Sequence, residues 1–111
     1  MDMQMRRGLL EACVLAVLHR GDSYGYQIAK DAKAGLEISE STLYPILKRL
    51  ESTDCLHVYS AEHNGRLRKY YRITSNGRQK CREFLNDWKE VTTVYDFIQK
   101  AVTGGDTYAQ I

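Results

Sequence analysis

The sequence has little of what marks secreted, membrane or disulfide-stabilised proteins. Its 111 residues include three cysteines at scattered positions, and this odd number does not make a disulfide framework. No segment approaches the ~20 apolar residues of a membrane span, and the N-terminus lacks the apolar run of a signal peptide. We therefore expect one soluble, cytoplasmic domain with a modest core. The formal net charge is only +2, so any strongly basic surface has to be local.

The sequence also lacks the groups of side chains that carry catalysis. It contains no evident Ser/His/Asp constellation, glycine-rich phosphate loop or clustered pair of carboxylates. Cys55, His57 and His63 lie close together in the sequence, but no CxxC or HxxxH spacing completes a metal site. We interpret the histidines as exposed strand residues. The sequence therefore indicates neither an enzyme nor a cofactor or metal site.

What the sequence does contain is an amphipathic stretch at Ile38–Glu51, reading ISESTLYPILKRLE, which we expect to be helical from about Ser41 to Thr53. Its apolar side chains fall at i, i+3, i+4 and i+7: Leu43, Ile46, Leu47 and Leu50. The opposite face carries Ser41, Tyr44, Lys48 and Ser52, with Arg49 at its edge. Ser39 or Ser41 can cap the start. This short cationic face suits a helix in a DNA major groove, although an ordinary surface helix has the same pattern.

Two short strands are predicted directly after this helix, at Leu56–His63 and Arg66–Ile73. Asn64-Gly65 joins them, and Asn-Gly is a strong hairpin signal because both central residues of a type I′ turn need positive φ. The second strand carries four cations and no acid: Arg66, Arg68, Lys69 and Arg72. A helix followed by a basic hairpin is the layout of a winged helix-turn-helix, whose wing neutralises phosphates beside the recognition helix.

Two helices are predicted before the amphipathic stretch. The first runs from Met5 to Arg20, where apolar residues recur on one face, and Gly21 follows as a stop signal. The second runs from Tyr24 to about Gly35, with Ser23 as its N-cap. We expect this second helix to bury Tyr26, Ile28, Ala29 and Ala32.

The last predicted helix runs from Ser75 to roughly Thr103, with Thr74 as its cap and Gly104 after its end. It carries a heptad seam with alternating spacings of three and four: Cys81, Phe84, Trp88, Val91, Tyr95, Ile98 and Val102. At ~1.5 Å per residue this helix is roughly 40 Å long, more than the small N-terminal core can cover. The seam favours a homodimer, which would place two recognition helices on a palindromic operator. The alternative is that the seam packs against other elements of the same chain.

Trp88 lies in the middle of this seam and has two interpretations. It can be a core residue of the interface, because indole buries a large apolar area. Its bulk can also hold two helices apart, so that two copies flank a cavity for a flat aromatic ligand. The seam alone leaves both open.

Three segments of the sequence resemble the PadR-like transcriptional regulators. They are GDSYGYQIAK at Gly21–Lys30, STLYPILKRLE at Ser41–Glu51, and RKYYRIT with the following Gly77 at Arg68–Gly77. Their order and gaps match the family over nearly the whole chain. The resemblance implies a winged helix-turn-helix dimer that represses transcription from a palindromic operator. The chain is most similar to the short subgroup, which keeps one C-terminal dimerisation helix and includes multidrug sensors with a ligand-stacking tryptophan at the place of Trp88.

The resemblance also implies which residues form each site. The DNA-binding residues would be Ser41, Thr42, Tyr44, Lys48, Arg49, Arg66, Arg68 and Lys69. An aromatic effector would bind at Trp88, Val91 and Tyr95, and the seam residues would form the dimer interface. By strand alternation, Tyr71 and Ile73 point into the core and Tyr70 points away.

Together these observations predict a mainly α fold with a small β-hairpin. Residues 1–73 would form a winged helix-turn-helix, 74–103 a C-terminal dimerisation helix and 104–111 a flexible tail. The predicted function is that of a sequence-specific, homodimeric repressor, associated with the nucleoid through double-stranded DNA and released by a small planar aromatic ligand. A winged-helix protein-interaction module that does not read DNA is the alternative, because a fold does not fix a function.

Overall fold

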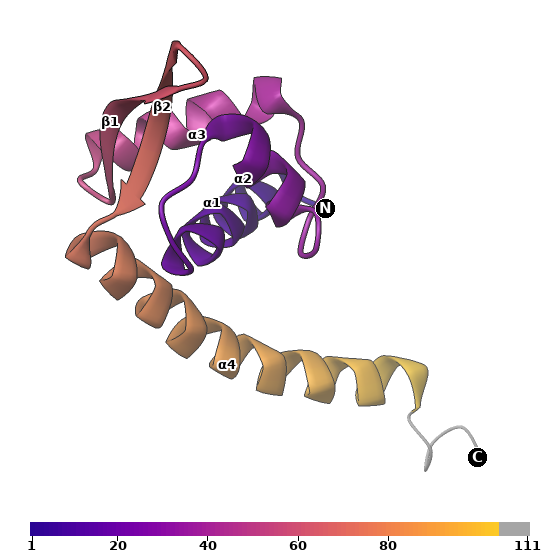
Figure 1. Cartoon of the computed structure of the whole chain (residues 1–111). Coiled ribbons are helices and arrows are strands. Elements are labelled where there is room, and N and C mark those ends of the chain that lie inside the picture. The colour runs from indigo at the N-terminus through magenta and orange to yellow at the C-terminus, as the bar shows by residue number, and fades with distance from the viewer. Residues whose placement is uncertain (105–111) are drawn as a thin grey trace. The chain divides into compact units, whose positions relative to one another are not determined.

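The computed structural model describes residues 1–104, which form four helices and one antiparallel hairpin (Figure 1). The elements are α1 (Met3–His19), α2 (Gly25–Ala32), α3 (Glu40–Ser52), β1 (Leu56–His63), β2 (Arg66–Ile73) and α4 (Ser75–Thr103). This architecture confirms the predicted winged-helix fold with a long C-terminal helix. Within the described part of the chain, none of the helices is long and apolar enough to span a membrane.

The chain divides into two compact units, residues 1–81 and residues 82–111. The hairpin strands and α4 have the predicted bounds, whereas α1 and α3 differ from prediction by only one or two residues at each end. The second helix is shorter than predicted, because it ends at Ala32 instead of near Gly35. The predicted tail lies, apart from Gly104, outside the described residues.

Two predictions about α2 are wrong. Ser23 does not cap the helix, because its main chain forms an isolated β-bridge with Tyr71: each backbone N–H donates to the other residue's carbonyl oxygen, at 3.2 and 2.8 Å. Tyr24 is the N-cap instead, without a side-chain hydrogen bond to the helix. Tyr26 is not buried but 60% exposed. The buried face of α2 contains Gly25, Ile28, Ala29 and Ala32, and Tyr26 lies about 100° around the helix from Gly25, outside that face.

The core of the first unit lies between α1, α2, α3 and the base of the hairpin. Its most deeply buried large side chains are Val14, Leu15, Leu18, Ile28, Leu43, Leu47 and Leu50. The predicted apolar stripe of α3 is therefore confirmed, since all four of its residues are buried. Cys13 and Cys81 are half-buried and pack against the edge of this core, so Cys81, the first residue of the predicted seam, contacts its own chain.

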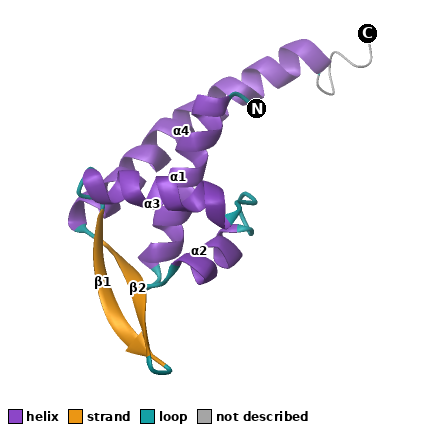
Figure 2. Ribbon diagram, turned by 90° about the horizontal axis from the view of Figure 1, so that it is seen from above, coloured by secondary structure: helices purple, strands orange, loops and turns teal. Residues whose placement is uncertain are grey.

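The hairpin pairs β1 with β2 in the register that an Asn-Gly turn dictates. Leu56 pairs with Ile73 and Val58 with Tyr71 on the core side, and the turn residues Asn64 and Gly65 have φ values of 52° and 79°. Tyr71 and Ile73 are buried as predicted. In Figure 2 the two strands extend as a ribbon away from α1, α2 and α3, which gives the domain its wing.

The start of α4 lies close to the loop that follows α3. Thr74 caps the helix as predicted, because its hydroxyl accepts the Gly77 N–H at 3.0 Å and donates to the Asp54 carbonyl at 2.7 Å. A Cβ on Gly77 would clash with the Cys55 carbonyl oxygen and would lie 2.7 Å from Cγ1 of Ile73. Asp54 has a left-handed φ of 62°, a conformation that aspartate tolerates better than most residues.

The second unit contains α4 from Arg82 to its end at Thr103, where Gly104 has a φ of 86°. Its predicted seam residues are half-buried near Arg82 and exposed farther along the helix. Phe84 and Trp88 are half-buried, and their rings stack with centroids 5.6 Å apart. Four further seam residues are exposed in the single chain: Val91 41%, Tyr95 58%, Ile98 51% and Val102 78%.

Candidate nucleic-acid interface

The outward face of α3 is the first part of the candidate site. Ser39 caps this helix by accepting the Thr42 N–H at 3.3 Å, which settles the choice between the two candidate serines. Ser41 and Lys48 lie opposite the buried stripe, and both are exposed. Pro45 lies within the helix on the same open side. The helix therefore presents a hydroxyl and an ammonium group from a rigid, well-packed element.

Two side chains at the edges of this face contact neighbouring helices. Tyr44 is 49% exposed, and its phenol lies over α2, where a Cβ added to Gly25 would be 2.8 Å from the Tyr44 hydroxyl. Arg49 turns toward α1 and forms an ion pair with Glu11, with 3.1 Å between Nε and Oε2. The Glu11 side chain is only 8% exposed and the Arg49 side chain 50%.

The Arg49–Glu11 pair changes the interpretation of Arg49. An acid buried against the core needs a cation, because an unpaired buried charge is costly. Sequence reasoning missed Glu11, although an acid on the otherwise apolar face of α1 was the available signal. Arg49 therefore fixes α3 to α1 in addition to any contact that its exposed half makes.

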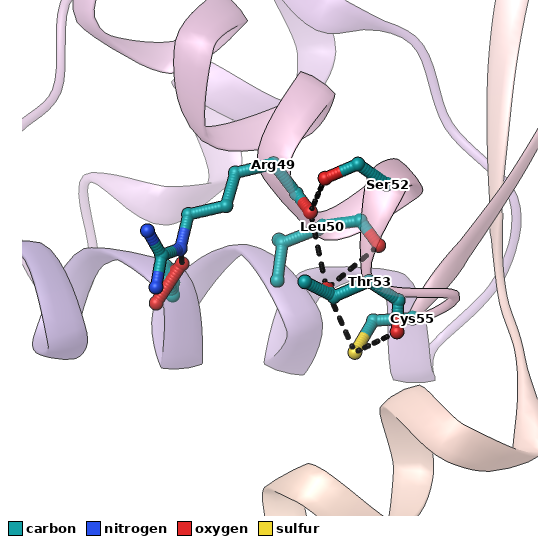
Figure 3. A network of polar contacts seen from close by, with 6 residues as sticks. Arg49, Leu50, Ser52, Thr53 and Cys55 are labelled. Atoms are coloured by element: carbon teal, nitrogen blue, oxygen red, sulfur yellow. Dashed lines mark hydrogen bonds and ion pairs between the residues drawn. The ribbon is translucent and has the colours of Figure 1, made fainter.

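Hydroxyl groups cap the C-terminal end of α3 by donating hydrogen bonds to carbonyl oxygens of its last turn (Figure 3). The Arg49 carbonyl oxygen accepts hydrogen bonds from the hydroxyls of Ser52 at 2.8 Å and Thr53 at 3.1 Å. The Thr53 hydroxyl also lies 3.3 Å from the Leu50 carbonyl oxygen and 3.6 Å from the sulfur of Cys55. Ser52 is exposed but its hydroxyl is turned toward its own backbone, whereas Lys48 and the acidic Glu51 are both exposed at this end of the helix.

The cations of the wing are divided between its two faces. Pairing and alternation place Arg66, Arg68 and Arg72 on one face and Lys69 on the other. The guanidinium carbon of Arg68 lies 3.9 Å from the ring centroid of Tyr24, a cation–π contact. Arg72 donates from Nε to Oδ2 of Asp22 at 3.1 Å. The predicted basic wing is present, but two of its four cations also make contacts within the protein.

A stack of tyrosines joins the wing to the start of α2. Tyr70 lies between Tyr24, with ring centroids 5.9 Å apart, and Tyr59, at 5.7 Å. The Tyr59 hydroxyl donates to Oδ2 of Asp22 at 2.6 Å, and this hydrogen bond raises the pKa of the phenol. Tyr70 points away from the core as predicted, but it is covered by these two rings. Sequence reasoning did not identify this stack or Asp22.

Cys55 and His57 are held in contacts unrelated to a metal ion. Cys55 is buried in the core, and the ring of His57 stacks on Tyr59 with centroids 6.3 Å apart. Within residues 1–104, histidine, cysteine and acidic side chains nowhere gather in threes that could hold a metal ion.

Comparisons with known proteins agree with this geometry. A family model described as the transcriptional regulator PadR-like family matches residues 14–83. A protein of Lysinibacillus sphaericus, described as uncharacterized protein X, is 33% identical over 101 residues, which cover 86% of this chain and 93% of that protein. The crystal structure of a PadR-like transcriptional regulator from Bacillus cereus is 35% identical with a TM-score of 0.74, covering 86% of this chain and 97% of that one.

A further solved structure shares the fold at lower identity. It is the crystal structure of Bacillus subtilis PadR in complex with operator DNA, which is 24% identical with a TM-score of 0.63 and covers 69% of this chain and 46% of that chain. The match of the family model to most of the chain is the decisive finding. The chain belongs to the PadR-like family of transcriptional regulators and is therefore a regulator of transcription rather than an enzyme.

Proposed function

We propose that this regulator is a homodimeric repressor that binds a palindromic operator through α3 and the wing. The observation that carries the proposal is the open face of α3, where Ser41, Tyr44 and Lys48 are exposed on a helix whose other side is fully buried. A rigid helix with short polar groups and one ammonium fits the major groove and can reach both base edges and phosphates. Bacillus subtilis PadR, which shares the fold, was crystallised with operator DNA.

The remaining cations support the same assignment. Arg66 is exposed near the tip of the wing, and Lys69 is exposed on its other face, so phosphates on either side of the wing have a cation to approach. The Arg68 guanidinium lies over the Tyr24 ring on the wing, and the Arg49 side chain is half exposed beside Glu11. Thr42 lies at the start of α3, where its hydroxyl accepts from Ser39 at 3.0 Å.

The exposed seam of α4 supports the homodimer. Val91, Tyr95 and Ile98 lie on one side of the helix at heptad spacing, and each is more than 40% exposed in the single chain. A second copy of the same helix offers a matching apolar surface, and a two-fold dimer matches the symmetry of a palindromic operator.

A planar aromatic ligand at Trp88 is the form of control that we propose for this dimer. The half-buried indole stacks on Phe84, and Val91 and Tyr95 follow it along the seam. Such a ligand can release DNA only if it binds the DNA-free arrangement of the dimer more tightly. Because Trp88 is the only tryptophan, titration with planar cationic dyes can be followed directly by its emission. Unchanged emission at a solvent-excluded wavelength would indicate a sealed core instead.

The function is tested by fluorescence anisotropy with the DNA upstream of the chain's own gene and a shuffled control, each at two salt concentrations. A specific regulator binds the upstream fragment at least ~10³-fold more tightly than the control. Equal and strongly salt-dependent binding to both fragments would show that the chain binds DNA only through non-specific electrostatic contacts with phosphates. Absence of binding at both salt concentrations would refute the DNA-binding function and favour a protein-interaction module.

A further inference from the structure

The wing is held to the rest of its unit by three consecutive residues of the α1–α2 loop. Ser23 pairs with Tyr71 of β2 through two main-chain hydrogen bonds. Asp22 binds side chains of both strands, and Tyr24 packs against Tyr70 and Arg68. A two-stranded hairpin is marginally stable by itself, so these contacts limit how far the wing can swing.

Asp22 makes the side-chain hydrogen bonds of this attachment through a single oxygen atom. Its Oδ2 accepts from the Tyr59 hydroxyl of β1 at 2.6 Å and from Nε of Arg72 of β2 at 3.1 Å. The Asp22 side chain is 30% exposed, so the ion pair is partly shielded from water. One carboxylate oxygen thereby joins the two strands to each other and to the helical core.

The attachment continues from Asp22 to the cations of the wing. Tyr59 stacks on Tyr70, Tyr70 meets Tyr24 edge-on, and the Tyr24 ring lies under the guanidinium group of Arg68. A displacement of Tyr59 after a change at Asp22 can therefore shift Arg68 through the contacting rings of Tyr70 and Tyr24. The same swing of the wing would displace Arg66, which lies closer to its tip.

We propose that Asp22 is a positioning residue for DNA binding, which holds the wing so that its cations and α3 can engage one DNA segment together. The inference rests on the proposed DNA-binding function and adds the acidic Asp22 to the residues that this function requires. Holding a binding surface in its bound geometry raises affinity because less conformational freedom is lost on binding. Asp22 itself does not touch DNA in this account.

This role predicts an effect opposite in sign to simple electrostatics. Removing an acid beside a DNA-binding surface should tighten binding, because the acid repels phosphates. If Asp22 positions the wing, its removal loosens binding although the net charge becomes more positive. The sign of the change thus separates the two accounts.

The experiment compares Asp22→Asn with Glu62→Gln, which neutralises an exposed acid on β1, the same strand as Tyr59. Tyr59→Phe is a second variant, which removes only the hydroxyl and leaves the charge unchanged. Operator binding is measured by anisotropy over a series of salt concentrations, after circular dichroism has shown that each variant is folded. In the DNA-free proteins, the ¹⁵N heteronuclear NOE of the wing amides reports the mobility of the hairpin.

We expect Asp22→Asn to weaken operator binding about fivefold to tenfold, to lower the slope of log K against log salt by ~1, and to reduce the wing NOE. Tyr59→Phe should weaken binding by a smaller factor in the same direction, and Glu62→Gln should leave binding unchanged or tighten it. Tighter binding by Asp22→Asn with an unchanged NOE would overturn the inference. If the wild-type chain bound no DNA, the proposed function would fail, and the NOE would still report whether Asp22 holds the wing.

Discussion

The first unit, residues 1–81, and the part of α4 after it use apolar side chains in opposite ways. In the first unit, valine and leucine at helical spacing are buried within the chain, with Val14 and Leu43 at 0% exposure. In α4 the heptad residues Val91 and Val102 have the same kind of spacing but are 41% and 78% exposed. The amphipathic pattern is therefore satisfied inside the first unit and left open in the second. The comparison teaches that periodicity identifies a surface to be covered but does not say which chain covers it.

The largest effect on stability is expected from Gly77→Ala, which tests how tightly the first unit is packed where α4 begins. An added Cβ would clash with the backbone carbonyl of Cys55 and press on Ile73, and neither can move without disturbing the core. We expect a loss of about 3 kcal/mol or more in the free energy of unfolding, measured by denaturant titration. An unchanged midpoint of denaturant unfolding would show that the start of α4 can shift without loss of stability. The description of the first unit as tightly packed around Gly77 would then be wrong.

A charge on the seam of α4 should have the next largest effect and should leave the first unit intact. Ile98→Asp places a carboxylate in the proposed dimer interface, where an unpaired buried charge costs about 3 kcal/mol. We expect sedimentation equilibrium to show dissociation of the dimer. Thr93→Asp is the matched control, because Thr93 lies on the other side of the helix and is also exposed. Equal behaviour of both variants, or a monomeric wild-type chain, would contradict the seam as an interface.

Sequence alone predicted those features that short stretches determine. The Asn64-Gly65 turn set the register of the hairpin, and the spacing of apolar residues gave the buried stripe of α3. Contacts between residues far apart in the sequence were missed. Arg49 lies 38 positions after Glu11 in the numbering, and Arg72 lies 50 positions after Asp22. The same cause explains the error at Ser23, whose main chain pairs with Tyr71. The error at Tyr26 has a different cause, because the prediction assigned this residue to the wrong face of α2.

Arg49→Ala and Lys48→Ala separate the inner and outer surfaces of α3 within the first unit. Removing Arg49 leaves Glu11 without its ion-pair partner against the core, and we expect a loss of about 1–2 kcal/mol in the free energy of unfolding. Removing Lys48 should leave stability unchanged and weaken operator binding by about 1 kcal/mol, or roughly fivefold. Thermal melts and anisotropy titrations of both variants check the two outcomes. A destabilised Lys48→Ala, or a fully stable Arg49→Ala, would reverse the assigned roles.

The smallest effect is expected at Gly8, which lies in α1 with open space around it. A Cβ added there meets no atom within 4 Å, in contrast to Gly77. Alanine in a helix is more favourable than glycine by about 0.5–1 kcal/mol, because the unfolded glycine chain has more conformations to lose. Gly8→Ala should therefore raise the unfolding midpoint slightly, where Gly77→Ala lowers it strongly. If Gly8→Ala instead weakened self-association, this surface of α1 would be covered by a second copy. The first unit would then, like α4, have surface that only a second copy covers. The two regions would differ only in that the first unit also buries a core of its own.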